Sequence, residues 1–190
     1  LRFVLSATST APAITLTRTI DSYAGDGPRI DELTAPNAVT TGSAATLSWK
    51  TRNAPRVQVY ANGLLVHEPP ATDVSAAARG SVTLPLSQVT ACELVAYGFN
   101  QVATRASRKV EVVKPAKAVA FNVPGSVATP GDAAVVSWKT QDAVRVEVQL
   151  KNGPVVFATE TPAQVAAGTT NLYPGVETSY VLVARNLAGD

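Results

Sequence analysis

The sequence repeats itself with a period of about 89 residues, which restricts the chain to a row of small units that are built alike. The segment from Gly42 to Thr51 reads GSAATLSWKT and the segment from Gly131 to Thr140 reads GDAAVVSWKT, so that Trp49 and Trp138 stand 89 residues apart. The match extends to Asn-Gly pairs at 62–63 and 152–153. Asn-Gly between two alternating runs is a strong hairpin signal, because both residues tolerate the positive φ of a type I′ turn.

A third copy of one segment places the boundaries of the units. The stretches 92–96, 180–184 and 3–7 share an aromatic residue or cysteine, then leucine, then alanine at alternate positions. This spacing predicts that residues 1–20 are the last two strands of a preceding repeat, that 28–113 form a complete repeat, and that 117–190 form a repeat lacking its final strand. The linkers are expected at 21–27 and 114–116. We expect the final strand of the last repeat, equivalent to residues 107–113, to come from a continuation of the chain or from another segment.

Composition and alternation favour β-structure throughout. Apolar residues make up 46% of the chain and charged residues 16%, with many alanines, valines and threonines, which suits small two-layer β-domains. Side chains of a strand alternate between its two faces. This alternation places Trp49, Trp138, Cys92 and Tyr180 on the inward faces, where we expect them to form the structural core.

The motif around each tryptophan resembles a known class of modules. The pattern Gly-x-x-Ala-x-Leu-Ser-Trp49, followed in the second repeat by Thr-Ser-Tyr180-Val-Leu-Val-Ala-Arg-Asn186, is similar to bacterial immunoglobulin-like and fibronectin type III-like tandem repeats. The resemblance implies an all-β fold of tandem immunoglobulin-like (fibronectin III-like) β-sandwiches. It also implies a spacer, stalk or adhesive array in a bacterial surface protein or secreted enzyme. Cys92 stands where the second repeat has Tyr180, which departs from the pattern.

The residues needed for catalysis are not grouped in this sequence. The chain has one histidine and one cysteine, His67 and Cys92, on different predicted strands, and no zinc-ligand spacing or phosphate-binding glycine loop. His67 aligns with Phe157, which predicts a packing or edge position and not a ligand. The sequence therefore predicts a protein that is not an enzyme and has no cofactor.

Charge and hydropathy limit the classes of partner that the sequence predicts. The net charge is +2, too small to indicate a nucleic-acid partner, and no apolar run is long enough to span a membrane. An exported location, extracellular or at the cell surface, with the periplasm as the alternative, follows from the family resemblance.

A cluster of carboxylates around the first linker is one candidate site. Asp21, Asp26 and Asp31 offer the oxygen ligands that calcium prefers and would stiffen the joint between repeats. The alternative is an ordinary set of solvated linker charges, because the second linker carries no carboxylate.

An aromatic cluster is the second candidate site. Tyr60, Tyr97 and Phe99 share the outward parity of strands expected to be neighbours, whereas the second repeat has Gln149, Arg185 and Leu187 at these positions. Exposed aromatic side chains indicate a surface for a glycan or a protein. The alternatives are packing between repeats and the ordinary exposure of scattered apolar residues.

The leading functional hypothesis is a non-catalytic structural and adhesive scaffold, whose partners are the other repeats of the same chain. A glycan- or protein-binding module is the first alternative, and an accessory domain of a secreted hydrolase, toxin or phage particle is the second. Self-assembly by strand exchange is a further expected mode of association, because an incomplete terminal repeat exposes an unpaired strand.

Overall fold

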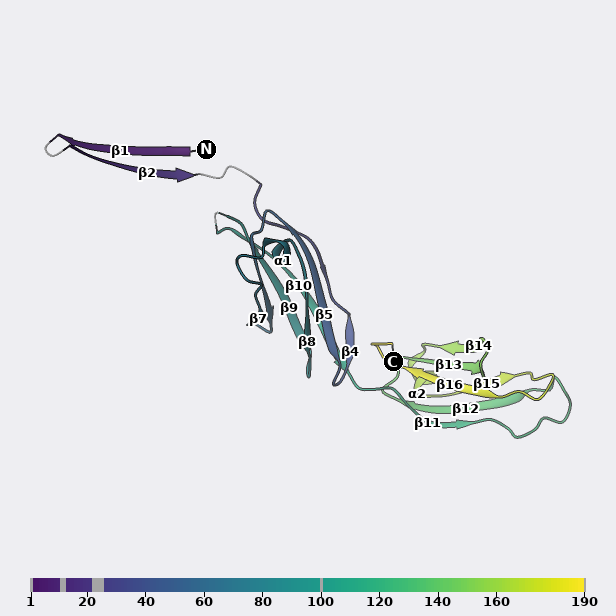
Figure 1. Ribbon diagram of the computed structural model, residues 1–190. Helices are drawn as coiled ribbons and strands as arrows, with labels where there is room; N and C mark the ends of the chain where they lie inside the picture. The colour runs from purple at the N-terminus through teal and green to yellow at the C-terminus, as the bar shows by residue number, and fades with distance from the viewer. Residues whose placement is uncertain (1, 11–12, 22–25, 100, 190) are drawn as a thin grey trace. The chain divides into compact units, whose positions relative to one another are not determined.

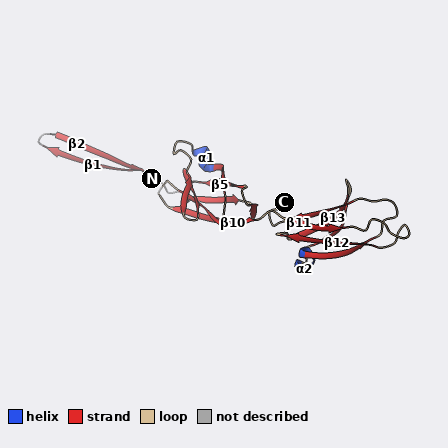
Figure 2. Cartoon of the chain, turned by 90° about the horizontal axis from the view of Figure 1, so that it is seen from below, coloured by secondary structure: helices blue, strands red, loops and turns tan. Residues whose placement is uncertain are grey.

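The computed structural model describes all of the chain except residues 1, 11–12, 22–25, 100 and 190 (Figure 1). The described residues are mainly β-strand, with two short helical turns, α1 and α2 (Figure 2). The fold class is all-β, as the alternating sequence pattern predicts.

An N-terminal hairpin consists of two strands that pair only with each other in the described part of the chain. β1 (Arg2–Thr10) and β2 (Ala13–Asp21) are antiparallel along their whole length, from Arg2 opposite Asp21 to Thr10 opposite Ala13.

The first sandwich is built from two sheets. One sheet has the order β4-β10-β9-β6-β7 and the other β3-β5-β8. The strands are β3 (Arg29–Thr34), β4 (Ala38–Thr40), β5 (Ala44–Arg52), β6 (Arg56–Ala61), β7 (Leu64–His67), β8 (Arg79–Pro85), β9 (Thr90–Tyr97) and β10 (Ala103–Val113).

The second sandwich repeats this order without the equivalents of β4 and β10 among its described residues. Its sheets are β14-β13-β16 and β11-β12-β15. The strands are β11 (Lys117–Asn122), β12 (Ala134–Gln141), β13 (Arg145–Leu150), β14 (Val155–Thr159), β15 (Ala167–Leu172) and β16 (Tyr180–Arg185).

The strand order makes the fold immunoglobulin-like. In immunoglobulin sandwiches the third, sixth and seventh strands share one sheet, and the first, second and fifth share the other. The sheet β10-β9-β6-β7 and the sheet β3-β5-β8 follow this arrangement, with β7 as an additional edge strand.

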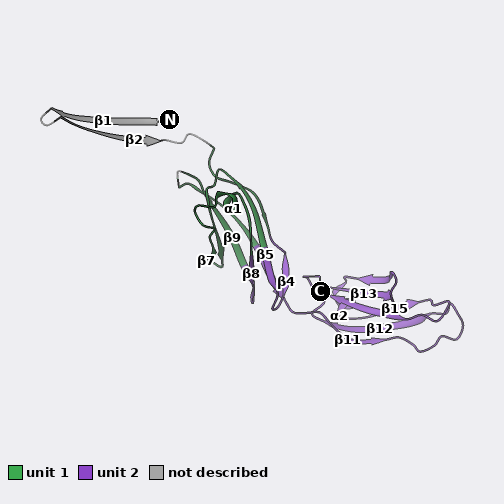
Figure 3. Ribbon diagram, in the orientation of Figure 1, with its two compact units in different colours: residues 1–34, 47–82, 91–108 green, residues 35–46, 83–90, 109–190 purple. Residues whose placement is uncertain are grey.

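Contacts along the chain group it into two compact units (Figure 3). One unit comprises 1–34, 47–82 and 91–108, and the other 35–46, 83–90 and 109–190. The boundary crosses β5, β8 and β10, each of which contributes residues to both units. The repeat limits expected from the sequence therefore stay a prediction.

The core of each sandwich is centred on a tryptophan whose indole N–H has a fixed partner. Trp49 and Trp138 are each 2% exposed. Trp49 Nε1 donates to the carbonyl of Ala76 at 3.1 Å, and Trp138 Nε1 donates to the carbonyl of Gln164 at 2.8 Å. Both acceptors lie in helical turns, α1 (Val74–Ala78) and α2 (Pro162–Ala166), which precede β8 and β15.

A threonine two residues after each tryptophan binds the next carbonyl of the same turn. Thr51 Oγ1 donates to Ala77 at 2.8 Å, and Thr140 Oγ1 donates to Val165 at 2.6 Å. A helical turn this short leaves its last carbonyls without helical partners. The Trp-x-Thr motif satisfies two of them and attaches the turn to the core.

A glycine on the following strand makes room for each indole. A Cβ added to Gly168 would lie 2.6 Å from Trp138 Cζ2, and one added to Gly80 would overlap Trp49 in the same way. We refer to the tryptophan, the helical turn and this glycine together as the Trp–turn–Gly lock.

The two Asn-Gly hairpins differ in detail. Asn62 and Gly63 have φ of 48° and 82°, which confirms the predicted turn. Asn152 has φ of 60°, but Gly153 does not take a positive φ. Pro154 follows Gly153, and a residue before proline is restricted to extended conformations, which explains the difference.

Candidate binding face

Tyr60 and Tyr97 lie on neighbouring strands and share one hydrogen-bond acceptor. The Tyr60 and Tyr97 hydroxyls donate to Gln58 Oε1 at 2.8 Å and 2.9 Å. β6 pairs with β9, with Tyr60 opposite Glu93 and Arg56 opposite Tyr97. The two tyrosines therefore converge on Gln58 from opposite ends of the strand pair.

Gln58 is held in turn by an ion pair from the adjacent edge. Gln58 Nε2 donates to Glu68 Oε2 at 2.8 Å, and Arg56 Nε donates to Glu68 Oε1 at 2.5 Å. The Arg56 guanidinium lies 4.9 Å from the centre of the Tyr97 ring. We call these five residues (Arg56, Gln58, Tyr60, Glu68 and Tyr97) the aromatic face.

The network sets the electrostatics of the aromatic face. The hydrogen bond from Arg56 holds the pKa of Glu68 below its ordinary value, so this carboxylate is ionised at neutral pH. Burial is the main cause that raises the pKa of the Tyr60 hydroxyl, which therefore stays protonated. The face presents partly exposed, rigidly held rings, which suits stacking against a ligand.

The structure places the remaining predicted residue outside this network. Phe99 follows the end of β9, in the turn before β10, and is 61% exposed. The structure thus brings Tyr60 and Tyr97 together on one face. Phe99 lies beyond the end of β9, so the alternation of that strand does not apply to it.

Gln58 shares the outward parity of Tyr60 on β6, yet the structure buries it. Gln58 points to the outer side of β6 but is only 6% exposed, because the two tyrosines and Glu68 cover it. Sequence analysis also missed the contribution of Glu68. The contacts that bury Gln58 come from Tyr97 and Glu68 on other segments of the chain, and alternation within one strand does not reveal them.

The second sandwich has an equivalent network made of charges. Glu147 takes the place of Gln58, 89 residues later, and is 7% exposed. It accepts from Arg145 Nε at 2.7 Å and Gln149 Nε2 at 3.0 Å, and Arg185 Nε lies 3.6 Å from it. Arg145 also donates to Glu160 at 2.6 Å. The position of the network is shared between the sandwiches, whereas its chemistry is not.

The stability of the second sandwich is expected to fall in acid because of Glu147. The hydrogen bond from Arg145 is the main cause that keeps the pKa of Glu147 below its ordinary value of 4.5. A carboxyl whose pKa is lower in the folded state stabilises the fold above the unfolded-state pKa and loses this contribution as the pH falls through the folded-state value. We therefore expect the free energy of unfolding to decrease as the pH is lowered below about 4.5.

Urea denaturation at a series of pH values, followed by Trp138 fluorescence in a Trp49→Phe background, measures this effect. Glu147→Gln should flatten the acid slope, and Glu177→Gln, at an exposed glutamate of the same sandwich, should not. An unchanged acid slope in Glu147→Gln would contradict the assignment.

The predicted calcium ligands are not assembled into a site. Asp31 is engaged by Arg52, which donates to its two oxygens at 2.6 Å and 2.8 Å and lowers the pKa of the Asp31 carboxyl. Asp26 has an exposed side chain, and the side chain of Asp21 lies outside the described residues. The described residues contain no group of three or more histidine, cysteine or acidic side chains suited to a metal.

Cys92 and His67, the one cysteine and the one histidine of the chain, both pack against other residues. Cys92 is fully buried, and this burial raises the pKa of its thiol. The ring of His67 lies 5.9 Å from that of Trp49, and Phe157 lies 5.4 Å from Trp138 at the matching place.

Among the described residues, no helix is both long and apolar enough to cross a membrane.

Comparisons with known proteins return similar structures and no sequence family. No protein-family model and no curated protein matches the sequence. The titin domains Z1Z2 in complex with telethonin are 14% identical, with a TM-score of 0.37 over 72% of this chain and 75% of that chain. Rst D1-D2 is 13% identical, with a TM-score of 0.39 over 70% and 73%.

A bacterial structure is also similar. SGBP-B of the Bacteroides ovatus mixed-linkage glucan utilization locus, in complex with a mixed-linkage heptasaccharide, is 10% identical, with a TM-score of 0.27 over 80% of this chain and 44% of that chain. These TM-scores are low, so the immunoglobulin-like assignment depends on the strand order of this chain itself.

Proposed function

We propose that this chain is a non-catalytic structural and adhesive segment, a spacer or stalk within a larger exported bacterial protein. The observation that supports this proposal is what the two sandwiches have in common. Both contain the Trp–turn–Gly lock, with the same donors and acceptors. The outer face has one chemistry in the first sandwich and another in the second.

A spacer needs this combination. Each unit of a spacer must fold reliably, and a shared core motif provides this. The outer faces of a spacer need not be alike, because its units do not bind one common ligand. Described buried side-chain nitrogen and oxygen atoms all have hydrogen-bond partners.

A second candidate function is the binding of a glycan or protein by the aromatic face. It is favoured by the tyrosine pair, which has no counterpart in the second sandwich and is held rigid by Gln58. Rigid aromatic side chains contribute contact area at a small entropic cost.

A glycan array and a pull-down with the whole chain separate these functions. A pure spacer is expected to show no saturable binding. If binding is found, Tyr60→Ala with Tyr97→Ala should reduce it at least about fivefold, since each such aromatic contact contributes roughly 0.5–1.5 kcal/mol beyond its buried area. Tyr173→Ala, at an exposed tyrosine outside the aromatic face, is the matched control. Binding that survives the double substitution rules out the aromatic face as the site.

A further inference from the structure

The hydrogen bonds of the aromatic face all have a fixed direction. Glu68 is ionised at neutral pH, and a carboxylate can only accept. Gln58 must therefore turn its amide nitrogen toward Glu68, which it reaches at 2.8 Å, and its amide oxygen toward the tyrosines. Both tyrosine hydroxyls donate to that oxygen, at 2.8 Å and 2.9 Å. One carboxylate thus sets the direction of the bonds that hold the two rings.

The two tyrosine oxygens are left as acceptors. A phenol hydroxyl has one proton to donate and lone pairs with which to accept. The protons of Tyr60 and Tyr97 are both used on Gln58, so the two oxygens present lone pairs to a ligand. Because they bond the same atom, they lie no further apart than the sum of their two distances to it. A ligand of this face is therefore expected to bring hydrogen-bond donors that are close together.

Arg56 adds donors beside these acceptors. Its Nε bonds Glu68, and its guanidinium lies 4.9 Å from the centre of the Tyr97 ring. In the part of the chain that the structure describes, the two terminal nitrogens of Arg56 have no hydrogen-bond partner. Two acceptors and a donor group thus lie next to partly exposed rings. Sugar hydroxyls both donate and accept, and the C–H groups of a sugar ring pack against aromatic side chains, so a saccharide matches this combination.

The charges beside the tyrosines are balanced. Arg105 Nη1 donates to both oxygens of Glu93 at 3.1 Å, and Glu93 is opposite Tyr60 in the register of β9 with β6. Arg56 is paired with Glu68. Each of these guanidiniums has its own carboxylate, so together they leave no excess charge to attract an anionic ligand. The face therefore suits an uncharged ligand.

The place of the aromatic face within the sheet disfavours a peptide strand. β6 and β9 are interior strands, each with a neighbour on both sides in the order β4-β10-β9-β6-β7. Their backbone N–H and C=O groups face neighbouring strands and are not open to an added strand, which is a recurring way of binding an extended peptide. A peptide would lie across this face without main-chain partners, whereas a saccharide bonds through its hydroxyls alone.

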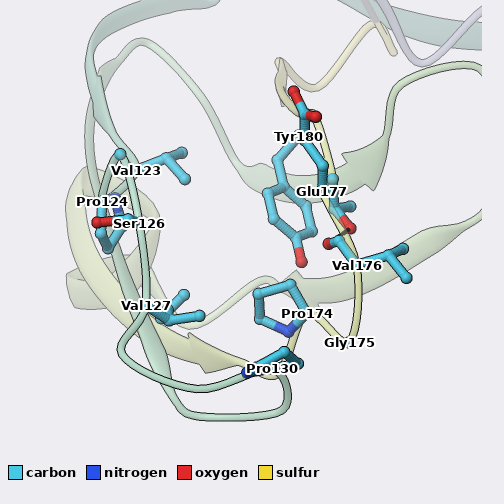
Figure 4. A pocket seen from close by; sticks show the side chains of 13 residues that line it. Val123, Pro124, Ser126, Val127, Pro130, Pro174, Gly175, Val176, Glu177 and Tyr180 are labelled. Atoms are coloured by element: carbon cyan, nitrogen blue, oxygen red, sulfur yellow. Dashed lines mark hydrogen bonds between the residues drawn. The ribbon is translucent and has the colours of Figure 1, made fainter.

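A cleft of about 330 Å³ in the second sandwich is the competing place for a small ligand (Figure 4). It lies between the loop after β11 and the loop before β16, and valine and proline side chains such as Val127, Pro130, Pro174 and Val176 form much of its wall. Polar groups that converge on a ligand provide orientation and specificity in a binding site. A mainly apolar wall offers few of them to a saccharide, so the cleft serves as the control site.

We propose that the aromatic face binds a neutral saccharide, with nearby hydroxyls donating to the oxygens of Tyr60 and Tyr97 and a sugar ring packed against their side chains. This inference rests on the binding function proposed above for the aromatic face, and it adds the class of ligand and the direction of its hydrogen bonds. The site belongs to the first sandwich, because Gln149 and Arg185 stand at the places of the tyrosines in the second.

Isothermal titration of the complete chain with uncharged oligosaccharides of glucose, mannose, galactose and xylose tests the class of ligand. An oligogalacturonate is the acidic counterpart. We expect saturable binding of at least one uncharged probe and weaker binding of the acidic one. Tighter binding of the acidic probe than of every uncharged probe would overturn the proposal of a neutral ligand.

A double-mutant cycle between protein and probe tests the direction of the hydrogen bonds. The bound probe is compared with its fully O-methylated form, which keeps acceptor oxygens but has no hydroxyl donors. Tyr60→Phe with Tyr97→Phe keeps both rings and removes both acceptors. Either change alone should weaken binding at least about fivefold, because two hydrogen bonds are lost. Both changes together should cost little more than one, since they remove the same bonds. Additive losses, or unchanged binding in the phenylalanine variant, would contradict the assignment.

Two controls and one replacement keep this test interpretable. Tyr173→Phe, at an exposed tyrosine outside the aromatic face, and Val176→Asp, at an exposed wall residue of the cleft, should bind as the original chain does. Binding lost in Val176→Asp but kept in the phenylalanine variant would place the ligand in the cleft and overturn the proposal. If the double variant does not fold, as judged by circular dichroism, the two single variants replace it, and each should weaken binding at least about twofold.

The ligand class and the binding function fail in different ways. Suppose that no saccharide binds, but a protein partner binds saturably and is lost in Tyr60→Ala with Tyr97→Ala. The aromatic face is then a binding site, and the saccharide assignment is overturned. If neither saccharides nor proteins bind saturably, both the ligand class and the binding function are overturned, and the spacer function stands alone.

Discussion

Trp138→Ala is expected to lower the free energy of unfolding of the second sandwich by about 3–5 kcal/mol, the range measured for large aromatic side chains removed from cores. The indole is 2% exposed and packs against Phe157 at a ring distance of 5.4 Å. Its removal also leaves the carbonyl of Gln164 without its 2.8 Å donor. Small domains have about 5–15 kcal/mol of stability in total, so this change approaches complete unfolding of the sandwich.

The sequence supplies its own control for this experiment. The chain has two tryptophans, one in each sandwich, so Trp49 fluorescence in Trp138→Ala reports only on the first. Urea denaturation should show that signal near its original midpoint, while circular dichroism shows a large part of the β-structure lost at lower urea. A Trp138→Ala chain with an unshifted transition in circular dichroism would show that the indole does not anchor the core.

Gly168→Ala is expected to destabilise the same sandwich by about 1–3 kcal/mol or more, as overpacking of a filled core does. The new methyl group would lie 2.6 Å from Trp138 Cζ2 and 2.6 Å from the carbonyl oxygen of Gln164. One contact is with a buried ring and the other is with backbone, so neither can move aside without breaking the Trp–turn–Gly lock.

Trp138 fluorescence in a Trp49→Phe background follows this substitution directly. Gly175→Ala is the matched control, because an added Cβ there meets nothing within 4 Å and φ is not positive. We expect that control to be neutral or slightly stabilising, since alanine restricts the unfolded chain. Equal effects of Gly168→Ala and Gly175→Ala would exclude the proposed clash.

The sequence predicted the parts of the fold that depend on periodicity. The repeat of the Trp49 segment at Trp138 and the alternation along each strand gave the all-β class. The Asn62-Gly63 turn followed from local conformational preference alone. Such features depend on neighbours in sequence, so one sequence is enough to find them.

The helical turns and the polar networks could not be predicted in the same way. The helical turns at 74–78 and 162–166 are too short to show a helical period in the sequence. They are held in place by hydrogen bonds from a tryptophan and a threonine more than twenty residues away. Gln58 and Glu147 read as exposed polar residues by alternation. Their burial arises from side chains on adjacent strands, which requires knowledge of the register.

The alternation of β6 separates two kinds of substitution. Val57 and Val59 face inward and belong to the core, whereas Arg56, Gln58 and Tyr60 face outward and belong to the aromatic face. A substitution at Val57 or Val59 therefore alters the core, whereas a substitution at Gln58 alters the outer hydrogen-bond network. A gene that encodes such units in series can vary its outer residues in matched groups, as from Gln58 and its tyrosines to Glu147 and its arginines, while the inward residues stay the same.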